Sequence, residues 1–359
     1  MLIDSFNRKI DYLRLSVTDR CNLRCTYCMP SGGIKLIDRQ EMLTFEEILQ
    51  AAGILSEMGI RKIRITGGEP LVRVGIIDLI KQIKKIEKIT DISITTNGIL
   101  LDEYLDELYK IPVQGINISL DSLDRQKYKE ITRGGEINQV LDAISNSINI
   151  GIKSVKINVV ITDLLDEKDI KGFVDMTLDK PVHVRFIEMM QPASGGDGSS
   201  GTIECSSIGG INNLEFNNLR PDSASQDFNP VDTIFSVMKK IGKYHAVNDK
   251  IGSGPALYYK VKKAKGSIGF IINDKNSCSY CNRIRLTPYG TIRLCLFSDK
   301  EYDIKKKIRD NYCAADIKAE IAEFVKAKPQ NREESCRYDN KGKVPINFKL
   351  KDFMNRIGG

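Results

Sequence analysis

The chain has 359 residues, which is enough for roughly two domains. Its formal net charge of +7 comes from 54 Lys and Arg against 47 Asp and Glu, too small an excess for a dedicated nucleic-acid-binding protein. No segment approaches the ~20 apolar residues that span a bilayer, so we expect neither a nucleic-acid nor a membrane partner. The first residues lack the basic and apolar regions of an export signal, and we expect a cytoplasmic protein.

Short β-branched runs alternate with helical patterns between residues 10 and 190, which is typical of a parallel sheet built from βα units. The six expected strands are residues 13–17, 62–66, 92–96, 115–120, 155–160 and 182–187. Six units are fewer than a closed eightfold barrel needs. We therefore predict an α/β fold, an incomplete (β/α)6 TIM-type barrel followed by a C-terminal extension.

Two helices between these strands have clear signals. Thr44 and Glu47 form a capping box that predicts a helix start, and apolar residues follow it at helical spacing. Residues 76–83 form a second amphipathic pattern, whose apolar face is expected to cover the sheet.

The composition changes after residue 190, and residues 191–210 contain six Gly and five Ser. We expect a barrel at 1–190, a Gly/Ser-rich insertion at 191–228, a smaller C-terminal region at 229–326 and a polar tail at 327–359. Within the smaller region we expect a helix at 231–241 and strands at 257–261 and 267–272.

Nine cysteines are the unusual feature of the composition, because a reducing compartment disfavours disulfides. Six of them fall into two groups of three, Cys21, Cys25 and Cys28 and then Cys278, Cys281 and Cys295, whereas Cys205, Cys313 and Cys336 stand alone. Two groups of three indicate metal binding rather than pairing.

The first group follows the first expected strand directly, at the end of an α/β barrel where active sites lie. Iron–sulfur clusters that only carry electrons take four cysteines, so three thiolates leave one iron open to another ligand. Small apolar cysteines on one helix face are an alternative, which the polar residues Arg20, Asn22 and Arg24 disfavour. A zinc site also remains open.

The spacing Cys-x3-Cys-x2-Cys with Tyr27 before the last thiol resembles the signature of the radical S-adenosylmethionine enzymes. The resemblance implies a 4Fe–4S cluster whose open iron holds S-adenosylmethionine, and cleavage to a 5′-deoxyadenosyl radical. Residues 67–70, Gly-Gly-Glu-Pro, are similar to a second motif of that family, which implies that Gly68 contacts the methionine group. A tight βα turn would by itself also explain these glycines.

Basic residues alternate with apolar ones along the expected strands, and the alternation places the basic set inside the barrel. The set comprises Arg14, Lys62, Arg64 and Lys156, with Arg185 as a further candidate. Converging cations are costly without an anion, so we predict a polyanionic ligand, with phosphate the natural match for guanidinium groups. The alternative is that each of these cations pairs with one of the carboxylates Glu69, Asp121 or Glu188, or extends its charged end to water.

The second cysteine group alone would fit a zinc site completed by Cys313, Cys336 or His245. Beside the first group, a second 4Fe–4S cluster with an open iron that binds a substrate nitrogen or oxygen is the better interpretation.

Residues 18–25, Thr-Asp-Arg-Cys-Asn-Leu-Arg-Cys, together with residues 281–285, Cys-Asn-Arg-Ile-Arg, resemble the GTP 3′,8-cyclase family of molybdenum cofactor biosynthesis. The resemblance implies GTP contacts by Arg14, Arg64, Thr95, Lys156, Arg283, Ile284 and Arg285. It implies S-adenosylmethionine contacts by Tyr27, Gly68, Ser119 and Met190. It also implies catalytic roles for the first cysteine group, for Arg283 and Arg285, and for a terminal Gly358-Gly359 that enters the active site.

The reaction implied by the resemblance is conversion of GTP to (8S)-3′,8-cyclo-7,8-dihydroguanosine 5′-triphosphate, with release of 5′-deoxyadenosine and methionine. The implied partners are a low-potential donor of flavodoxin or ferredoxin type, the pterin synthase that takes the product, and a second copy in a homodimer. The alternatives are a peptide maturase with an auxiliary cluster and a zinc-stabilised binding protein without catalysis.

Overall fold

Alternating strands and helices build one curved sheet in the computed structural model, which describes residues 1–189, 229–249, 251–272, 278–298, 300–331 and 334. The strands are β1 (Tyr12–Ser16), β2 (Lys62–Thr66), β3 (Asp91–Thr96), β4 (Gly115–Ser119), β5 (Val155–Ile161), β6 (Val182–Glu188), β7 (Tyr244–Val247), β8 (Leu257–Val261), β9 (Ser267–Ile271), β10 (Arg283–Leu286), β11 (Thr291–Arg293) and β12 (Glu301–Asp303).

The helices follow the strands along the chain. They are α1 (Phe45–Met58), the 3-10 turn η1 (Pro70–Val72), α2 (Ile76–Lys84), α3 (Leu101–Lys110), α4 (Arg125–Thr132), α5 (Ile137–Asn149), α6 (Glu167–Asp179), α7 (Pro230–Ile241), α9 (Ile304–Arg309) and α10 (Ala314–Lys326). Within these ranges, no helix is both long and apolar enough to cross a bilayer.

Strands β1 to β6 lie side by side in chain order, and each neighbouring pair is parallel. The sheet order runs from β12 at one end to β7 at the other, so the six βα units form an open barrel. The predicted incomplete (β/α)6 barrel is confirmed, and the six expected strands agree with the observed ones to within one residue at each end.

The strands after residue 229 extend the same sheet at both of its edges. Strand β9 pairs in parallel with β6, and β10 pairs in parallel with β1. Strand β10 was not among the expected strands, although Ile284 and Leu286 alternate with two arginines and are fully buried. The C-terminal strands therefore bring residues from far along the chain beside the first strand of the barrel.

Local sequence signals explain where the covering helices begin and end. The Thr44 side chain accepts a hydrogen bond from the amide of Glu47, whose carboxylate accepts one from the amide of Thr44, as the capping box predicted. Gly59 ends α1 in the left-handed conformation that favours glycine. The predicted α2 buries five apolar residues of residues 76–83 against the sheet.

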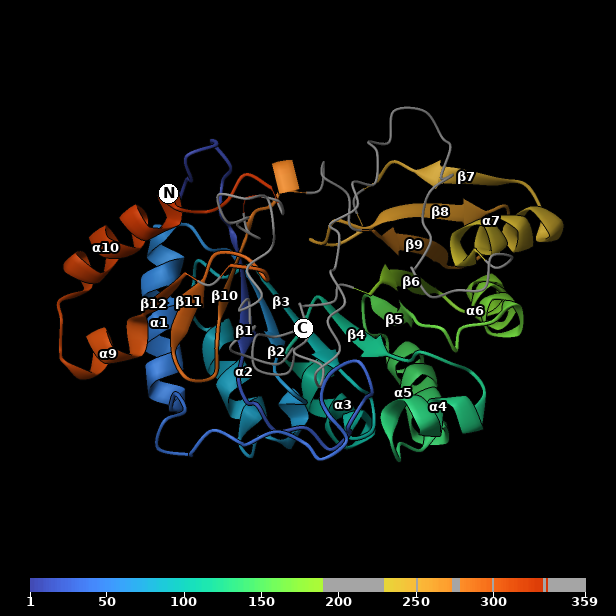
Figure 1. Ribbon diagram of the computed structural model, residues 1–359, viewed down its shortest axis with the longest axis horizontal. Helices are drawn as coiled ribbons and strands as arrows, with labels where there is room; N and C mark the ends of the chain where they lie inside the picture. The colour runs from blue at the N-terminus through green and yellow to red at the C-terminus, as the bar shows by residue number, and fades with distance from the viewer. Residues whose placement is uncertain (190–228, 250, 273–277, 299, 332–333, 335–359) are drawn as a thin grey trace, which may run out of the picture.

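The C-terminal helices pack at the ends of the barrel. Helices α9 and α10 contact α1, and α7 contacts α6, as Figure 1 shows. The predicted helix at 231–241 and the strands at 257–261 and 267–272 are present with small shifts at their ends.

Candidate active site

A cavity of about 370 Å³ opens at the carboxyl ends of the strands. All six grouped cysteines line it, although about 250 residues separate the two groups in sequence. Five arginines line it as well: Arg14, Arg64, Arg185, Arg283 and Arg285. The volume lies within the range of small-molecule sites.

The first cysteine loop follows β1 and is held by the turn after β2. The amide of Gly68 donates a hydrogen bond to the carbonyl of Thr18 at 2.7 Å. The amide of Glu69 donates one to the carbonyl of Arg20 at 2.8 Å. A Cβ atom at Gly68 would lie 2.4 Å from the Arg20 carbonyl oxygen, and one at Gly67 would lie 2.7 Å from the Thr18 oxygen. Close backbone approach therefore requires both glycines, and both Gly67 and Gly68 line the cavity.

Helix α4 supports the other side of this loop. The amides of Arg24 and Thr26 donate to the carbonyls of Thr132 and Ile131 at 3.1 and 2.9 Å. The Arg133 guanidinium donates to the carbonyl of Met29 at 2.9 Å. Two neighbouring elements thus fix the backbone that presents the three thiols.

The thiols of the first group are half-buried and near one another. Burial raises the pKa of Cys25 well above its usual range and that of Cys28 to about 12, and the neighbouring thiols and Asp121 raise both further. Three thiolates here require a compensating cation, and an iron–sulfur core provides one. Among the described residues, no three Cys, His, Asp or Glu side chains converge closely enough for a single ion. Three thiols on one cavity wall are the ligand set of a four-iron cluster with one open iron.

The buried carboxylates Glu69 and Asp121 interact with groups other than the arginines. Glu69 accepts hydrogen bonds from the amides of Leu71 and Asn97 at 3.1 and 2.6 Å, and from the Thr96 hydroxyl at 2.8 Å. Burial nevertheless raises its pKa to about 7.

Asp121 accepts hydrogen bonds from the Val160 amide at 2.8 Å and from the Tyr27 hydroxyl at 2.7 Å. Burial raises its pKa to about 6. Glu69 and Asp121 therefore serve to shape the cysteine end of the cavity, and the alternative that they pair with the inward cations is wrong.

Three arginines form a row across adjacent strands. Arg14 on β1 lies in register with Arg64 on β2 and with Arg285 on β10. Burial lowers the pKa of Arg14, and the charges of Arg285 and Arg64 lower it further. Burial also lowers the pKa of Arg285, to about 10, so Arg285 remains cationic at neutral pH. Parallel neighbours about 4.8 Å apart provide a compact site for several phosphate oxygens.

Arg185 lies deeper in the barrel, where its guanidinium donates to the side-chain oxygens of Asn117, at 2.7 Å, and Asn158. Lys156 is buried and donates to the Ser154 hydroxyl at 2.5 Å, but it does not line the cavity. Burial lowers the pKa of Lys156 to about 7, and the charges of Arg185 and Arg64 add to this effect. The lysine therefore lies behind the arginines that face the cavity.

The other expected contact residues are divided between wall and core. Thr95, Ser119 and Tyr27 line the cavity. Ile284 points into the hydrophobic core with no exposed surface, so only its backbone remains available to a ligand. Lys62 pairs with Asp11 at 3.2 Å and does not line the cavity.

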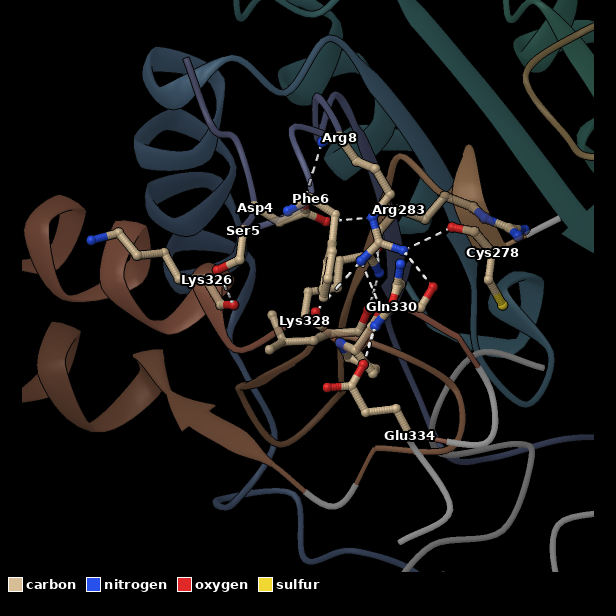
Figure 2. A network of polar contacts seen from close by, with 12 residues as sticks. Asp4, Ser5, Phe6, Arg8, Cys278, Arg283, Lys326, Lys328, Gln330 and Glu334 are labelled. Carbon is tan, nitrogen blue, oxygen red and sulfur yellow. Dashed lines mark hydrogen bonds and ion pairs between the residues drawn. The ribbon is translucent and has the colours of Figure 1, made fainter. Parts of the chain in front are cut away.

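The second cysteine group lies on the turn before β10 and directly after β11. The amide of Cys281 donates to the carbonyl of Cys278 at 3.1 Å. Burial raises the pKa of Cys281, but the charges of Lys328 and Arg283 prevail and lower it to about 6. Figure 2 shows the network of Asp4, Arg8 and Lys328 beside this turn.

Several residues named from the sequence are not part of this wall. Met190, Cys205, Cys336, Gly358 and Gly359 lie outside the described residues. Cys313 is exposed at the start of α10, and His245 is exposed on β7. Neither Cys313 nor His245 lines the cavity, so the structure does not bring these two zinc-ligand candidates to the second group.

Sequence reasoning missed several functional neighbours. Tyr12 lines the cavity two residues before Arg14, so the alternation of residues along the strand already pointed to it. Arg8 and Lys328 had no local signal, because they reach the second group only through tertiary packing.

Comparisons with known proteins agree with this geometry. The Radical SAM superfamily matches residues 15–177, and the family described as Molybdenum Cofactor Synthesis C matches residues 210–334. In solved structures, SuiB of Streptococcus suis bound to S-adenosylmethionine has a TM-score of 0.57 at 12% identity, covering 87% of this chain and 68% of that chain. At this identity the likeness concerns the fold.

Relatives described as GTP 3′,8-cyclase cover nearly the whole chain. The relative from Peptoclostridium acidaminophilum is 40% identical over 92% of this chain and 93% of its own length. The relative from Thermodesulfovibrio yellowstonii is 40% identical over 93% of this chain and 96% of its own length. The relative from Alkaliphilus metalliredigens is 39% identical over 99% of both chains. The chain belongs to the GTP 3′,8-cyclase family of radical S-adenosylmethionine enzymes.

Proposed function

We propose that this chain converts GTP to (8S)-3′,8-cyclo-7,8-dihydroguanosine 5′-triphosphate, the first step of molybdenum cofactor biosynthesis. The main structural support for this proposal is that two cysteine groups from opposite ends of the sequence line one cavity together with five arginines. The family relationship supports the identity of the substrate.

The cofactors follow from the family. They are a 4Fe–4S cluster with S-adenosylmethionine, and a second 4Fe–4S cluster. When bound, the first cluster, reduced by one electron from the donor, and S-adenosylmethionine would supply the radical chemistry that removes a hydrogen atom from the substrate, with 5′-deoxyadenosine and methionine as the released products. We assign the first cluster to Cys21, Cys25 and Cys28, and the second to Cys278, Cys281 and Cys295.

The arginine row binds the triphosphate in this proposal. Arg14, Arg64 and Arg285 lie in register on three neighbouring strands, and guanidinium groups match phosphate oxygens in pairs. Lys156 and Arg185 add positive charge behind the row, and Arg283 lies two residues before Arg285 on the same face of β10. Thr95 completes the wall, and Ile284 contributes its backbone.

The wall beside the first cysteine group binds S-adenosylmethionine. Gly68 presents backbone without a side chain, and Tyr27 is oriented by its hydrogen bond to Asp121. Ser119 lies at the end of β4 on the cavity wall. Met190 and the terminal Gly358 and Gly359 remain assigned from the family resemblance, the former to S-adenosylmethionine and the latter two to catalysis.

The protein residues act mainly by placement. Holding the triphosphate at the arginine row and S-adenosylmethionine at the Gly68 turn places the ribose between the two cysteine groups. An enclosed site keeps a reactive carbon radical from side reactions with water and protein. Arg283 lies at the second cysteine group and orients the guanine part of the substrate.

The partners and organisation extend the proposal. We assign a flavodoxin- or ferredoxin-type electron donor, transfer of the product to a pterin synthase, a homodimer and a cytoplasmic location. We retain domain boundaries at 1–190, 191–228, 229–326 and 327–359 as part of the proposal. The matched range 15–177 lies within the first of these segments, whereas the matched range 210–334 begins inside the second and ends inside the fourth.

Anaerobic reconstitution tests the proposal. The full chain is expected to bind about eight irons, and Cys281→Ala about four. Reduced enzyme with S-adenosylmethionine should form 5′-deoxyadenosine and a cyclised guanosine product with GTP, and no cyclised product with ATP, CTP or UTP. Cys313→Ala is the matched control, because this exposed thiol does not line the cavity. Cyclisation that persists in Cys281→Ala, or its absence with GTP in the wild-type enzyme, would refute the proposal.

A further inference from the structure

A buried lysine from the end of the described chain lies beside the second cysteine group. Lys328 follows α10 and is only 3% exposed. Its ammonium donates to the carbonyl of Arg283 at 2.9 Å and to that of Leu294. Arg283 is two residues after Cys281, and Leu294 directly precedes Cys295, so one ammonium bridges the two backbone segments that carry these thiols.

The bridge is itself held by a second buried cation. The Arg8 guanidinium donates to the carbonyls of Cys278 at 2.8 Å, Pro329 at 2.7 Å and Gln330 at 3.1 Å. Figure 2 shows Arg8 and Lys328 on the same side of the turn that carries Cys278. The N-terminal segment, the cysteine turn and the chain after α10 are therefore tied together at one point.

The two cations differ in how their charge is compensated. Arg8 forms a buried ion pair with Asp4 at 2.5 Å. Within the described ranges Lys328 has carbonyl partners but no ion pair with a carboxylate. Carbonyls satisfy its hydrogen bonds, but burying an ammonium is costly unless negative charge lies near it. Lys328 lies close enough for its charge to act on the sulfurs of both Cys281 and Cys278, which become thiolates when they ligate a cluster.

We propose that Lys328 is a positioning residue for the second cluster, a fixed positive charge that both joins the two ligand-bearing segments and favours the reduced cluster. The inference rests on the assignment of the second cluster to Cys278, Cys281 and Cys295. Charge and hydrogen bonds around the sulfurs set the potential of such clusters. Adding an electron makes the cluster more negative, so a nearby ammonium raises its reduction potential.

The test compares Lys328→Gln, which keeps a hydrogen-bond donor without the charge, with Lys328→Arg, which keeps the charge. Iron content is measured first in the full-length chain, and about eight irons in the wild type establish the second cluster independently of Lys328. The midpoint potential is then followed by electron paramagnetic resonance during redox titration. The titration is repeated in full-length chains whose first cysteine group is replaced by alanine, so that only the second cluster contributes.

In Lys328→Gln the ratio of reduced to oxidised second cluster at a fixed potential is expected to fall about tenfold. For a one-electron couple this corresponds to a midpoint potential lower by about 59 mV. Lys328→Arg is expected to remain near the wild-type potential. Lys305→Met is the matched control, because Lys305 is a buried lysine that pairs with Glu41 at 2.9 Å and does not line the cavity.

Each outcome decides the proposal. Loss of the second cluster in Lys328→Gln but not in Lys328→Arg also supports it, because the charge then restores the site. An unchanged potential in Lys328→Gln with the cluster retained overturns it. Loss of the cluster in both variants overturns it too, because a positive charge at this position is then insufficient.

Discussion

Arg14 on β1 lies in register with Arg285 on β10, although 271 positions separate the two residues in sequence. Two half-buried guanidinium groups on neighbouring strands repel each other, and each lowers the stability of the other's charged form. A fold keeps such a pair where an anionic ligand compensates it. The pair is therefore the point at which the C-terminal strands complete the site begun by the barrel.

Replacing Arg64, the third member of the row, is expected to weaken GTP binding. Loss of a hydrogen bond between charged groups costs about 1.5–3 kcal/mol, so Arg64→Ala should raise KM for GTP by about 10- to 150-fold. Iron content and S-adenosylmethionine binding should remain unchanged, because the Arg64 guanidinium donates a hydrogen bond to the Tyr12 hydroxyl and not to the cysteine loop. Steady-state kinetics and iron analysis measure the two effects.

Arg61→Ala is the control for this variant. Arg61 lies just before the same strand and donates to the carbonyls of Ser56 and Ile60 at 2.7 and 3.0 Å, outside the cavity. Its KM for GTP should match the wild type. An equal rise in KM in both variants would show that the row does not bind the triphosphate.

Gly68→Ala is expected to displace the first cysteine loop. The added methyl group would lie 2.4 Å from the Arg20 carbonyl oxygen, so the backbone contact between the two turns cannot survive. We expect reconstituted iron to fall from about eight to about four atoms and S-adenosylmethionine cleavage to be lost. Iron analysis and 5′-deoxyadenosine formation check the result.

Gly53→Ala provides the comparison, because no atom lies within 4 Å of a Cβ at this position in α1. A helical alanine in place of glycine should stabilise the protein by about 1 kcal/mol and leave both clusters bound. Full iron content in Gly68→Ala would contradict the role given to the turn.

GTP affinity is expected to depend on pH through Lys156. Its pKa is about 7 behind the cavity wall, whereas the usual value is 10.5. A phosphate bound at the arginines in front of it favours the charged form through its negative charge and raises this pKa, so above pH 7 the lysine must take up a proton when GTP binds. Affinity should therefore fall as pH rises from about 7, by up to tenfold per unit.

Lys156→Met separates this effect from the titration of GTP itself. The variant should bind GTP more weakly than the wild type near pH 7. Above pH 7 its GTP affinity should lack the additional fall that proton uptake by Lys156 causes in the wild type. Calorimetry of the cluster-loaded enzyme between pH 6.5 and 9 measures both, in buffers of different ionisation enthalpy to count protons. Parallel pH profiles for the variant and wild type would argue against proton uptake by Lys156.

Local sequence patterns were sufficient for the barrel and for the first cysteine loop. Alternation along β1 to β6, the capping box at Thr44 and the spacing of Cys21, Cys25 and Cys28 each depend on neighbours within a few residues. The inward direction of Arg14 and Arg64 followed from the same alternation, because a strand presents every second residue to one face.

Tertiary structure alone decided how the distant segments meet. Strand β10 joins β1 instead of lying in a separate unit, which places Arg285 beside Arg14 and the second cysteine group opposite the first. Lys156 was expected to face the cavity, yet it does not line it, because depth in a barrel depends on the curvature of the sheet. Arg8 and Lys328 meet Cys278 and Arg283 through packing across more than 250 and about 45 residues of sequence, a distance at which no periodic pattern carries information.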